Sequence, residues 1–144
     1  MTVEPPSSHQ PPDWVAGLSL GHLSDRMGIQ IVDWDPDRLV ATMPVEGNQQ
    51  PYGIVHGGAY CVLAESLGST AAALSVGPQR AVVGIELNAS YHRAAVQGTI
   101  TAICRNLHLG GTLTCHEIDM TDDSGTRLCT VRLRCLVRDR PPAS

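Results

Sequence analysis

The sequence contains no lysine and no phenylalanine, and it has few aromatic residues of any kind. Its 144 residues carry 10 basic side chains, all of them arginine, against 14 carboxylates, which gives a formal net charge of −4. The absence of lysine excludes a lysine Schiff base, pyridoxal chemistry and the lysine of a P-loop. The aromatic rings are limited to Trp14, Trp34, Tyr52, Tyr60 and Tyr91. With so little positive charge and stacking surface, we expect no nucleic-acid partner.

The five cysteines are odd in number, scattered along the chain, and include no CxxC pair. The start of the chain also lacks the basic residues and the apolar stretch of a secretory signal. These features are typical of reduced thiols in a cytoplasmic protein. Neither the cysteines nor the six histidines have the spacing of a metal site, so we expect no bound metal.

The length fits one domain. Residues 1–12 include four prolines and are interpreted as a disordered leader, residues 13–140 as the domain, and residues 141–144 as a tail. Hydrophobic periodicity predicts a helix over residues 13–27 that ends at Gly28. Two β-rich runs, at 29–34 and 39–45, flank a turn and predict a hairpin.

A long apolar helix is predicted over residues 59–74, because this segment is rich in good helix formers and is followed by a Gly-Pro stop. Four strands are predicted after it. The first alternates, with Val83, Ile85, Leu87, Ala89 and Tyr91 on its buried face. The next two cover 99–109 and 113–121 around Gly110 and Gly111. The last one places five apolar residues on one face, namely Cys129, Val131, Leu133, Cys135 and Val137.

Together these elements predict an α+β fold in which an antiparallel sheet wraps a helix. Residues 59–76 are just long enough to raise the question of a membrane span. However, the segment contains Glu65 and several serines and is rich in alanine, so we interpret it as the buried helix of a protein without membrane contact. A helix that is apolar on nearly all sides needs cover from a strongly curved sheet or from a partner subunit.

Glu65 is the only charged side chain between Gly47 and Gln79. A carboxylate in a buried helix is costly unless it is paired, hydrogen-bonded or protonated. Two interpretations remain open: Glu65 lies on a narrow solvent-facing stripe, or it points into a site as a nucleophile or general base. Partial desolvation in such a site would increase its reactivity.

Four further residues accompany Glu65 as candidates. Ser69, four residues on, shares its helix face, although a serine there is also compatible with simple packing. Gly57 starts the helix, where free backbone N–H groups suit an oxyanion, although a glycine pair is usually just a turn. His56 and Gln50 precede it and are able to orient a carbonyl or a water.

The segment 50–58 reads Gln-Pro-Tyr-Gly-Ile-Val-His-Gly-Gly, and 63–69 reads Leu-Ala-Glu-Ser-Leu-Gly-Ser. These segments resemble the active-site region of hotdog-fold acyl-CoA thioesterases in the 4-hydroxybenzoyl-CoA thioesterase superfamily. The likeness is greatest to the branch with phenylacetate-pathway, enterobactin-associated and menaquinone-pathway enzymes, and weaker similarity runs from Trp14 to Val137. It implies the hotdog fold and hydrolysis of an acyl- or aroyl-CoA to the free acid and coenzyme A, possible substrates being 1,4-dihydroxy-2-naphthoyl-CoA or other aromatic or β-keto acyl-CoA thioesters.

The resemblance also implies roles. Glu65 would be the catalytic carboxylate, the Gly57 N–H would polarise the thioester carbonyl, and Gln50, His56 and Ser69 would lie around the thioester and the water. Coenzyme A, as part of the substrate and the only cofactor-like group expected, would contact Gly84, Tyr91, His92, Arg93, Ala94, His108, Leu109, Gly110, Gly111 and Thr112. Without lysine, its phosphates must meet arginine, histidine or backbone N–H groups. The Arg-rich last strand is a second candidate for this contact, or else a solvated sheet face.

The resemblance further implies a homodimer that forms the active site between subunits and is commonly paired into a dimer of dimers. Two other functions remain open. A hotdog hydratase or dehydratase typically pairs its acidic residue with a nearby histidine, which this helix lacks after Glu65. A non-catalytic acyl-CoA-binding module would have no use for a carboxylate facing the thioester.

Overall fold

The computed structural model describes residues 9–142, so residues 1–8 of the predicted leader and 143–144 of the predicted tail lie outside the described part. Within it, the chain order is α1 (His22–Met27), β1 (Gln30–Asp35), β2 (Arg38–Pro44), α2 (Gly57–Val76), β3 (Arg80–Tyr91), β4 (Thr99–Leu109), β5 (Leu113–Thr121) and β6 (Arg127–Asp139). The strands form one sheet in the order β1-β2-β4-β5-β6-β3, and every neighbouring pair is antiparallel. The predicted α+β class is confirmed.

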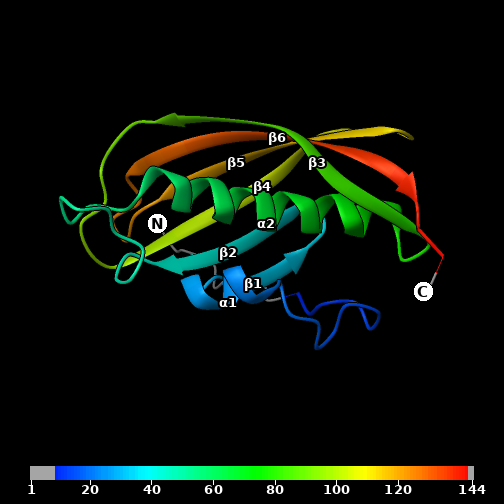
Figure 1. Ribbon diagram of the computed structural model, residues 1–144, viewed down its shortest axis with the longest axis horizontal. Coiled ribbons are helices and arrows are strands. Elements are labelled where there is room, and N and C mark those ends of the chain that lie inside the picture. Colours follow the sequence, from blue (N-terminus) through cyan, green and yellow to red (C-terminus); the bar gives the residue numbers. More distant parts are fainter. Residues whose placement is uncertain (1–8, 143–144) are drawn as a thin grey trace, which may run out of the picture.

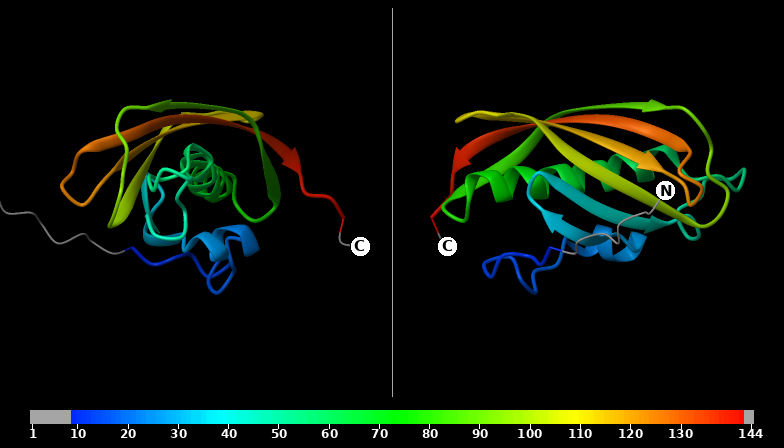
Figure 2. Two further views of the ribbon diagram at one scale, coloured as in Figure 1. Left: turned by 60° about the vertical axis from the view of Figure 1, so that its left-hand side comes forward. Right: turned by 180° about the vertical axis from the view of Figure 1, so that it is seen from behind.

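Helix α2 lies in the concave face of the curved sheet (Figures 1 and 2). It packs on strands β2 to β6, and eight of its residues are buried, namely Ala59, Tyr60, Leu63, Ala64, Leu67, Gly68, Ala71 and Ala72. The approach is close because Gly68 has no side chain: a Cβ there would lie 2.6 Å from Leu133 Cδ2. α2 is long and apolar enough to cross a membrane by length and composition, but its place in the sheet matches the predicted core helix.

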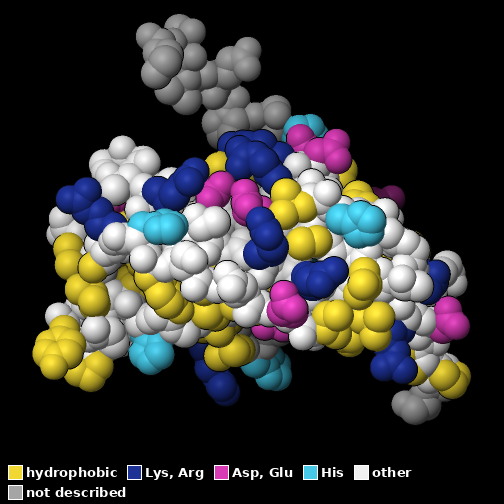
Figure 3. All heavy atoms as spheres, turned by 90° about the horizontal axis from the view of Figure 1, so that it is seen from above, with side chains coloured by type: hydrophobic (Ala, Val, Ile, Leu, Met, Phe, Trp, Pro, Cys, Tyr) yellow, Lys and Arg dark blue, Asp and Glu magenta, His cyan; other side chains and the backbone are white. Residues whose placement is uncertain are grey.

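The outer face of the sheet carries charged side chains of both signs, with hydrophobic side chains between them (Figure 3). Asp119 on β5 lies 3.9 Å from Arg105 and 3.7 Å from Arg127, and Glu117 lies 3.6 Å from Arg132. On β6 the five predicted apolar residues are buried and Arg132 and Arg134 are exposed. The alternation along this strand therefore separates core from solvent as predicted.

The N-terminal helix is shorter than predicted. Only residues 22–27 are helical, and residues 13–20 form turns and irregular chain instead of the first part of a helix over 13–27. The reason is the backbone at Gly17 and Gly21, whose φ angles of 77° and 102° are incompatible with a right-handed helix. Within this irregular chain Leu20 packs against the core, whereas Trp14 and Leu18 are exposed.

The alternation predicted for β3 is wrong in its first half. A bulge between Gly84 and Glu86 shifts the register against β6, so that Val83 and Ile85 are exposed while Val82 packs on the core. Beyond the bulge, Leu87 and Ala89 face inward as predicted, and Tyr91 at the end of the strand is again exposed. Among the described residues β3 has one strand partner, β6, so its other edge is open.

Candidate functional site

The candidate site begins where α2 starts. His56 caps the helix, and its ring Nδ1 accepts a 2.8 Å hydrogen bond from the Gly58 N–H. The loop before it is fixed by a 2.9 Å bond from the His56 N–H to the Asn48 carbonyl, and Asn48 in turn donates to the carbonyls of Met27 and Pro44. The first turn of α2 is thus held by the end of α1 and the end of β2.

One first-turn donor remains free. Gly58 donates to His56 Nδ1 and the Ala59 N–H donates to the His56 carbonyl, whereas the Gly57 N–H has no acceptor within residues 9–142. Free N–H groups at a helix N-terminus are a ready site for a developing negative charge. This agrees with the oxyanion role predicted for Gly57.

A cavity of about 350 Å³ opens beside this turn. It brings together six of the predicted site residues, namely Gln50, Gly57, Tyr91, His92, Arg93 and Ala94. Gln50 and Gly57 lie 34 to 44 positions before Tyr91–Ala94 in the sequence. The two groups meet because β3 runs back along α2 and because the Val55 N–H bonds to the Ala95 carbonyl at 3.0 Å. The Gln50 side-chain oxygen accepts a bond from the Tyr52 N–H, which fixes the turn that carries it.

Glu65 lies eight residues further along α2, which is about 12 Å along the axis at the helical rise per residue. Its side chain is exposed in the single chain, and no described residue donates a hydrogen bond to the carboxylate. The carboxylate rests against β3, since a Cβ on Gly84 would lie 2.8 Å from Glu65 Oε1. The absence of a side chain at Gly84 therefore leaves the space that the carboxylate occupies.

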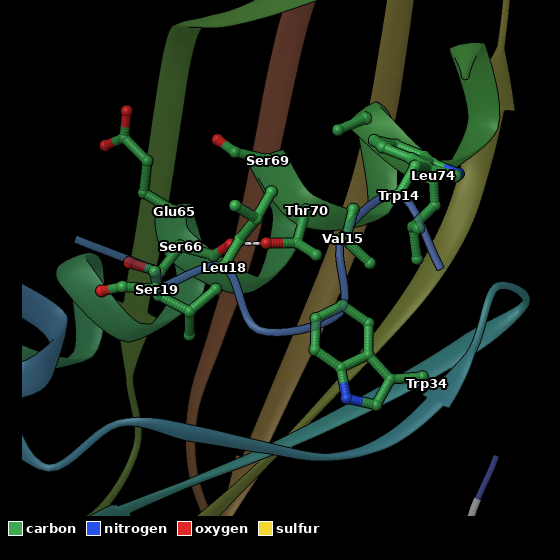
Figure 4. A pocket seen from close by; sticks show the side chains of 12 residues that line it. Trp14, Val15, Leu18, Ser19, Trp34, Glu65, Ser66, Ser69, Thr70 and Leu74 are labelled. Carbon is green, nitrogen blue, oxygen red and sulfur yellow. Dashed lines mark hydrogen bonds between the residues drawn. The ribbon is translucent and has the colours of Figure 1, made fainter. Parts of the chain in front are cut away.

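Glu65 opens onto a second cavity, of about 470 Å³, between α2 and the N-terminal segment (Figure 4). Glu65 and Ser69 project from the same side of the helix, as their spacing predicts. The hydroxyls of two neighbours are satisfied within the protein: Ser66 bonds to Ser24 at 3.0 Å and Thr70 to the Ser66 carbonyl at 2.7 Å. Burial raises the pKa of the nearby Cys135 thiol, while hydrogen bonds from Ser69 and Thr114 act in the opposite direction.

The opposite wall of this cavity is apolar and was missed by the sequence analysis. It consists of Trp14, Val15, Leu18 and Leu20 from the N-terminal segment and Trp34 from β1. The periodic apolar residues of 14–20 predict one face of a helix, whereas in the structure they belong to an irregular chain. Nothing in the sequence alone pairs this segment with Glu65.

The other predicted coenzyme A contacts lie elsewhere in one chain. His108 and Leu109 end β4, and residues 110–112 form the turn to β5, next to the β6 residues Cys135 and Val137. Tyr91 pairs with Cys129, at the other end of β6. One chain therefore does not bring His108, Leu109, Gly110, Gly111 and Thr112 to the cavity at Tyr91. Gly84 lies near Glu65 and pairs with Cys135 of β6, whereas Tyr91 is seven residues further along β3.

Metal-ligand clusters are absent from the described part of the chain: no three His, Cys, Asp or Glu side chains are placed to hold an ion. The five cysteines, all within it, are free thiols.

Comparison with known proteins identifies the family. The family model of the thioesterase superfamily matches residues 52–129. The chain is 45% identical to the proofreading thioesterase EntH of Cronobacter turicensis over 83% of this chain and 88% of that protein. It is 40% identical to the 1,4-dihydroxy-2-naphthoyl-CoA hydrolase of Escherichia coli K12, over 78% of this chain and 84% of that one.

Solved structures agree with these relatives. A thioesterase from Haemophilus influenzae superposes with a TM-score of 0.79 at 33% identity, covering 81% of this chain and 82% of that one. Its fold, like that of this chain, surrounds a long central helix with an antiparallel sheet. The chain therefore belongs to the thioesterase superfamily and is a thioester hydrolase with the hotdog fold.

Proposed function

We propose that the protein hydrolyses an acyl-CoA whose acyl group carries an aromatic ring, with Glu65 as nucleophile or general base. The observation that carries this proposal is the cavity of about 470 Å³, whose lining includes Glu65 and Ser69 on α2 and also the indole rings of Trp14 and Trp34. Flat rings favour offset or edge contacts with other rings, and each such contact contributes about 0.5–1.5 kcal/mol beyond area burial. The relative that is named a 1,4-dihydroxy-2-naphthoyl-CoA hydrolase supports the same class.

In the proposed reaction, water or the Glu65 carboxylate attacks the thioester carbonyl carbon. The Gly57 N–H stabilises the negative charge that develops on the carbonyl oxygen. The C–S bond then breaks, and coenzyme A leaves as a thiolate that takes up a proton. With Glu65 as base, the proton that it takes from the attacking water passes to the thiolate and the acid is released directly. With Glu65 as nucleophile, a single water then cleaves the anhydride and supplies the proton. Gln50 and His56 orient the carbonyl or the water.

The site is completed by a second copy of the chain. Glu65 and the Gly57 N–H lie about 12 Å apart along one helix, too far to act on one carbonyl. Strand β3 has an open edge within the described residues and carries the exposed Val83 and Ile85. A homodimer across this edge would bring Glu65 of one subunit to Gly57 of the other, and two dimers would form the tetramer.

Coenzyme A would then contact residues from both subunits. Arg93 supplies a cation at the cavity beside Gly57, and the β4–β5 turn offers backbone N–H groups at Gly110 and Gly111. Arg132 on the outer face of β6 is paired with Glu117, which favours a solvated sheet face over a coenzyme A contact for this strand. The five free thiols favour a reducing compartment, which supports a cytoplasmic location.

The test is thiol release from a panel of acyl-CoA thioesters. We expect turnover, with kcat/KM at least tenfold higher for benzoyl and naphthoyl thioesters than for butyryl- or palmitoyl-CoA. Thioester hydrolysis without this preference would contradict the aromatic class. Hydration of an enoyl-CoA without thiol release would indicate the hydratase, and binding without turnover the non-catalytic module.

A further inference from the structure

The side chain of Tyr91 crosses from the end of β3 to the first turn of α2. Its hydroxyl donates a 2.9 Å hydrogen bond to the Gly57 carbonyl oxygen and lies 3.4 Å from Cys61 Sγ. Because the single hydroxyl proton goes to the carbonyl, the Cys61 thiol is the donor in the second contact. The ring also packs on Tyr60, with centroids 5.8 Å apart. Tyr91 is therefore fixed by three neighbours on α2.

These bonds hold the peptide unit between Gly57 and Gly58 at both ends. Tyr91 binds its carbonyl, and the His56 ring binds its N–H at 2.8 Å. The preceding peptide is held through the His56 carbonyl, which accepts from the Ala59 N–H at 2.9 Å. Of the groups in these two peptides, the Gly57 N–H alone has no partner within residues 9–142.

Two consecutive glycines would otherwise leave this turn with large backbone freedom. The space that a side chain would fill at Gly57 is taken by Tyr91, since a Cβ there would lie 3.1 Å from the Tyr91 hydroxyl oxygen. Catalysis by backbone donors depends on their orientation before the charge develops. The Tyr91 hydroxyl, which comes from β3, thus restricts a turn that the two glycines alone would leave flexible.

We propose that Tyr91 is a positioning residue, whose hydroxyl orients the Gly57 N–H toward the thioester carbonyl oxygen. The inference rests on the proposed function, in which that N–H is the oxyanion donor. It differs from the coenzyme A contact that the family resemblance implies for Tyr91, because the hydroxyl is already engaged within the protein. The neighbouring Cys61, followed by burial, raises the pKa of Tyr91 to about 12, so the hydroxyl keeps its proton near neutral pH.

The first experiment compares wild type with Tyr91→Phe, which keeps the ring and removes the hydroxyl. Loss of one hydrogen bond of about 0.5–1.5 kcal/mol predicts a fall in kcat of about three- to tenfold. We expect KM to change by less than about twofold, because substrate binding is not lost. Tyr52→Phe is the matched control, since its phenol is 91% exposed and bonds to no described residue. A raised KM with unchanged kcat would identify a coenzyme A contact and overturn the proposal.

The second experiment measures binding of two uncleavable analogues by calorimetry: a ketone with CH₂ in place of the thioester sulfur, and a thioether without the carbonyl. Tyr91→Phe should weaken the ketone about three- to tenfold and leave the thioether unchanged. An equal loss of affinity for the two analogues, or no loss for either, would overturn the proposal. If the wild type releases no thiol, the proposed function fails, while the ratio of analogue affinities still tests Tyr91.

Discussion

At the scale of single residues, two neighbours shape the surroundings of Glu65: Gly84, which has no side chain, and Ser69, which is polar. Gly84 leaves room for the carboxylate, and Ser69 lies one helical turn on, facing the same cavity. The relation to Ser69 follows from helical spacing and was predictable. The contact with Gly84 joins α2 to a strand whose register includes a bulge, and no local pattern in the sequence reveals it.

Replacing Glu65 with Gln tests its proposed role. The amide has the same shape but neither accepts a proton nor attacks the carbonyl, so we expect kcat to fall by about 10²-fold or more. Steady-state thiol release gives kcat, and thermal unfolding shows whether the fold is kept. Because the side chain is exposed in the single chain, the melting temperature should be little changed. Activity within twofold of wild type would exclude Glu65 as the catalytic carboxylate.

His116 determines part of the pH dependence of stability. It is fully buried between Asn106 and Thr114, each bonded to one ring nitrogen at 2.9 Å. Burial lowers the pKa of His116 from 6.5 to about 4. Between these values the unfolded chain binds the extra proton, so the free energy of unfolding decreases as the pH falls. Between pH 7.5 and 5.0 we expect a loss of about 2 kcal/mol from this group.

Urea unfolding at the two pH values measures this loss. His116→Gln is the comparison, because the amide keeps hydrogen bonding but does not titrate. We expect this variant to be less stable than the wild type at pH 7.5. The informative quantity is therefore the change in its free energy of unfolding between the two pH values. A difference equal to that of the wild type would show that His116 does not cause the pH dependence.

At the scale of elements, the long helix and most of the strands could be predicted, since their patterns are local. β4 and β5 have the predicted bounds, and α2 exceeds the predicted helix by two residues at each end. The predictions failed where the positive φ angle of a glycine or the pairing of two strands determines the structure. Gly17 and Gly21 end the periodic pattern of 14–20, and the bulge in β3 changes which side chains face the core. The cavity at Gly57 likewise requires the β3–α2 contact.

The end of α1 offers a stability test at this scale. Gly28 terminates α1 with φ at 73°, and a Cβ there would lie 2.9 Å from two atoms of Pro44. Gly28→Ala should lower the free energy of unfolding by about 1–2 kcal/mol, from the left-handed backbone alone. Gly111→Ala is the control, because its Cβ would meet no atom within 4 Å and its φ is not in the positive region. Equal denaturation midpoints for the two variants would contradict this account.

At the scale of the whole molecule, the exposed edge of β3 predicts self-association. We expect light scattering to show a dimer or tetramer, and Ile85→Glu to shift it toward monomer with loss of thiol release. Val32→Glu is a matched control, since Val32 is also exposed and also lies in a bulge, but on β1 at the opposite end of the sheet. Full activity in a monomeric Ile85→Glu variant would exclude a shared site.

The strand order also has a consequence for the way the chain folds. Strand β3 hydrogen-bonds only to β6 within the described residues, and β6 is the last strand to be synthesised. Until Arg127–Asp139 is available, β3 has no partner and one side of the apolar helix α2 is uncovered. Such long-range pairing slows folding and exposes intermediates to aggregation. Because Tyr91 and Gly84 both lie on β3, the site acquires its shape only in the final folding step, and a chain shortened at its C-terminus would lose both together.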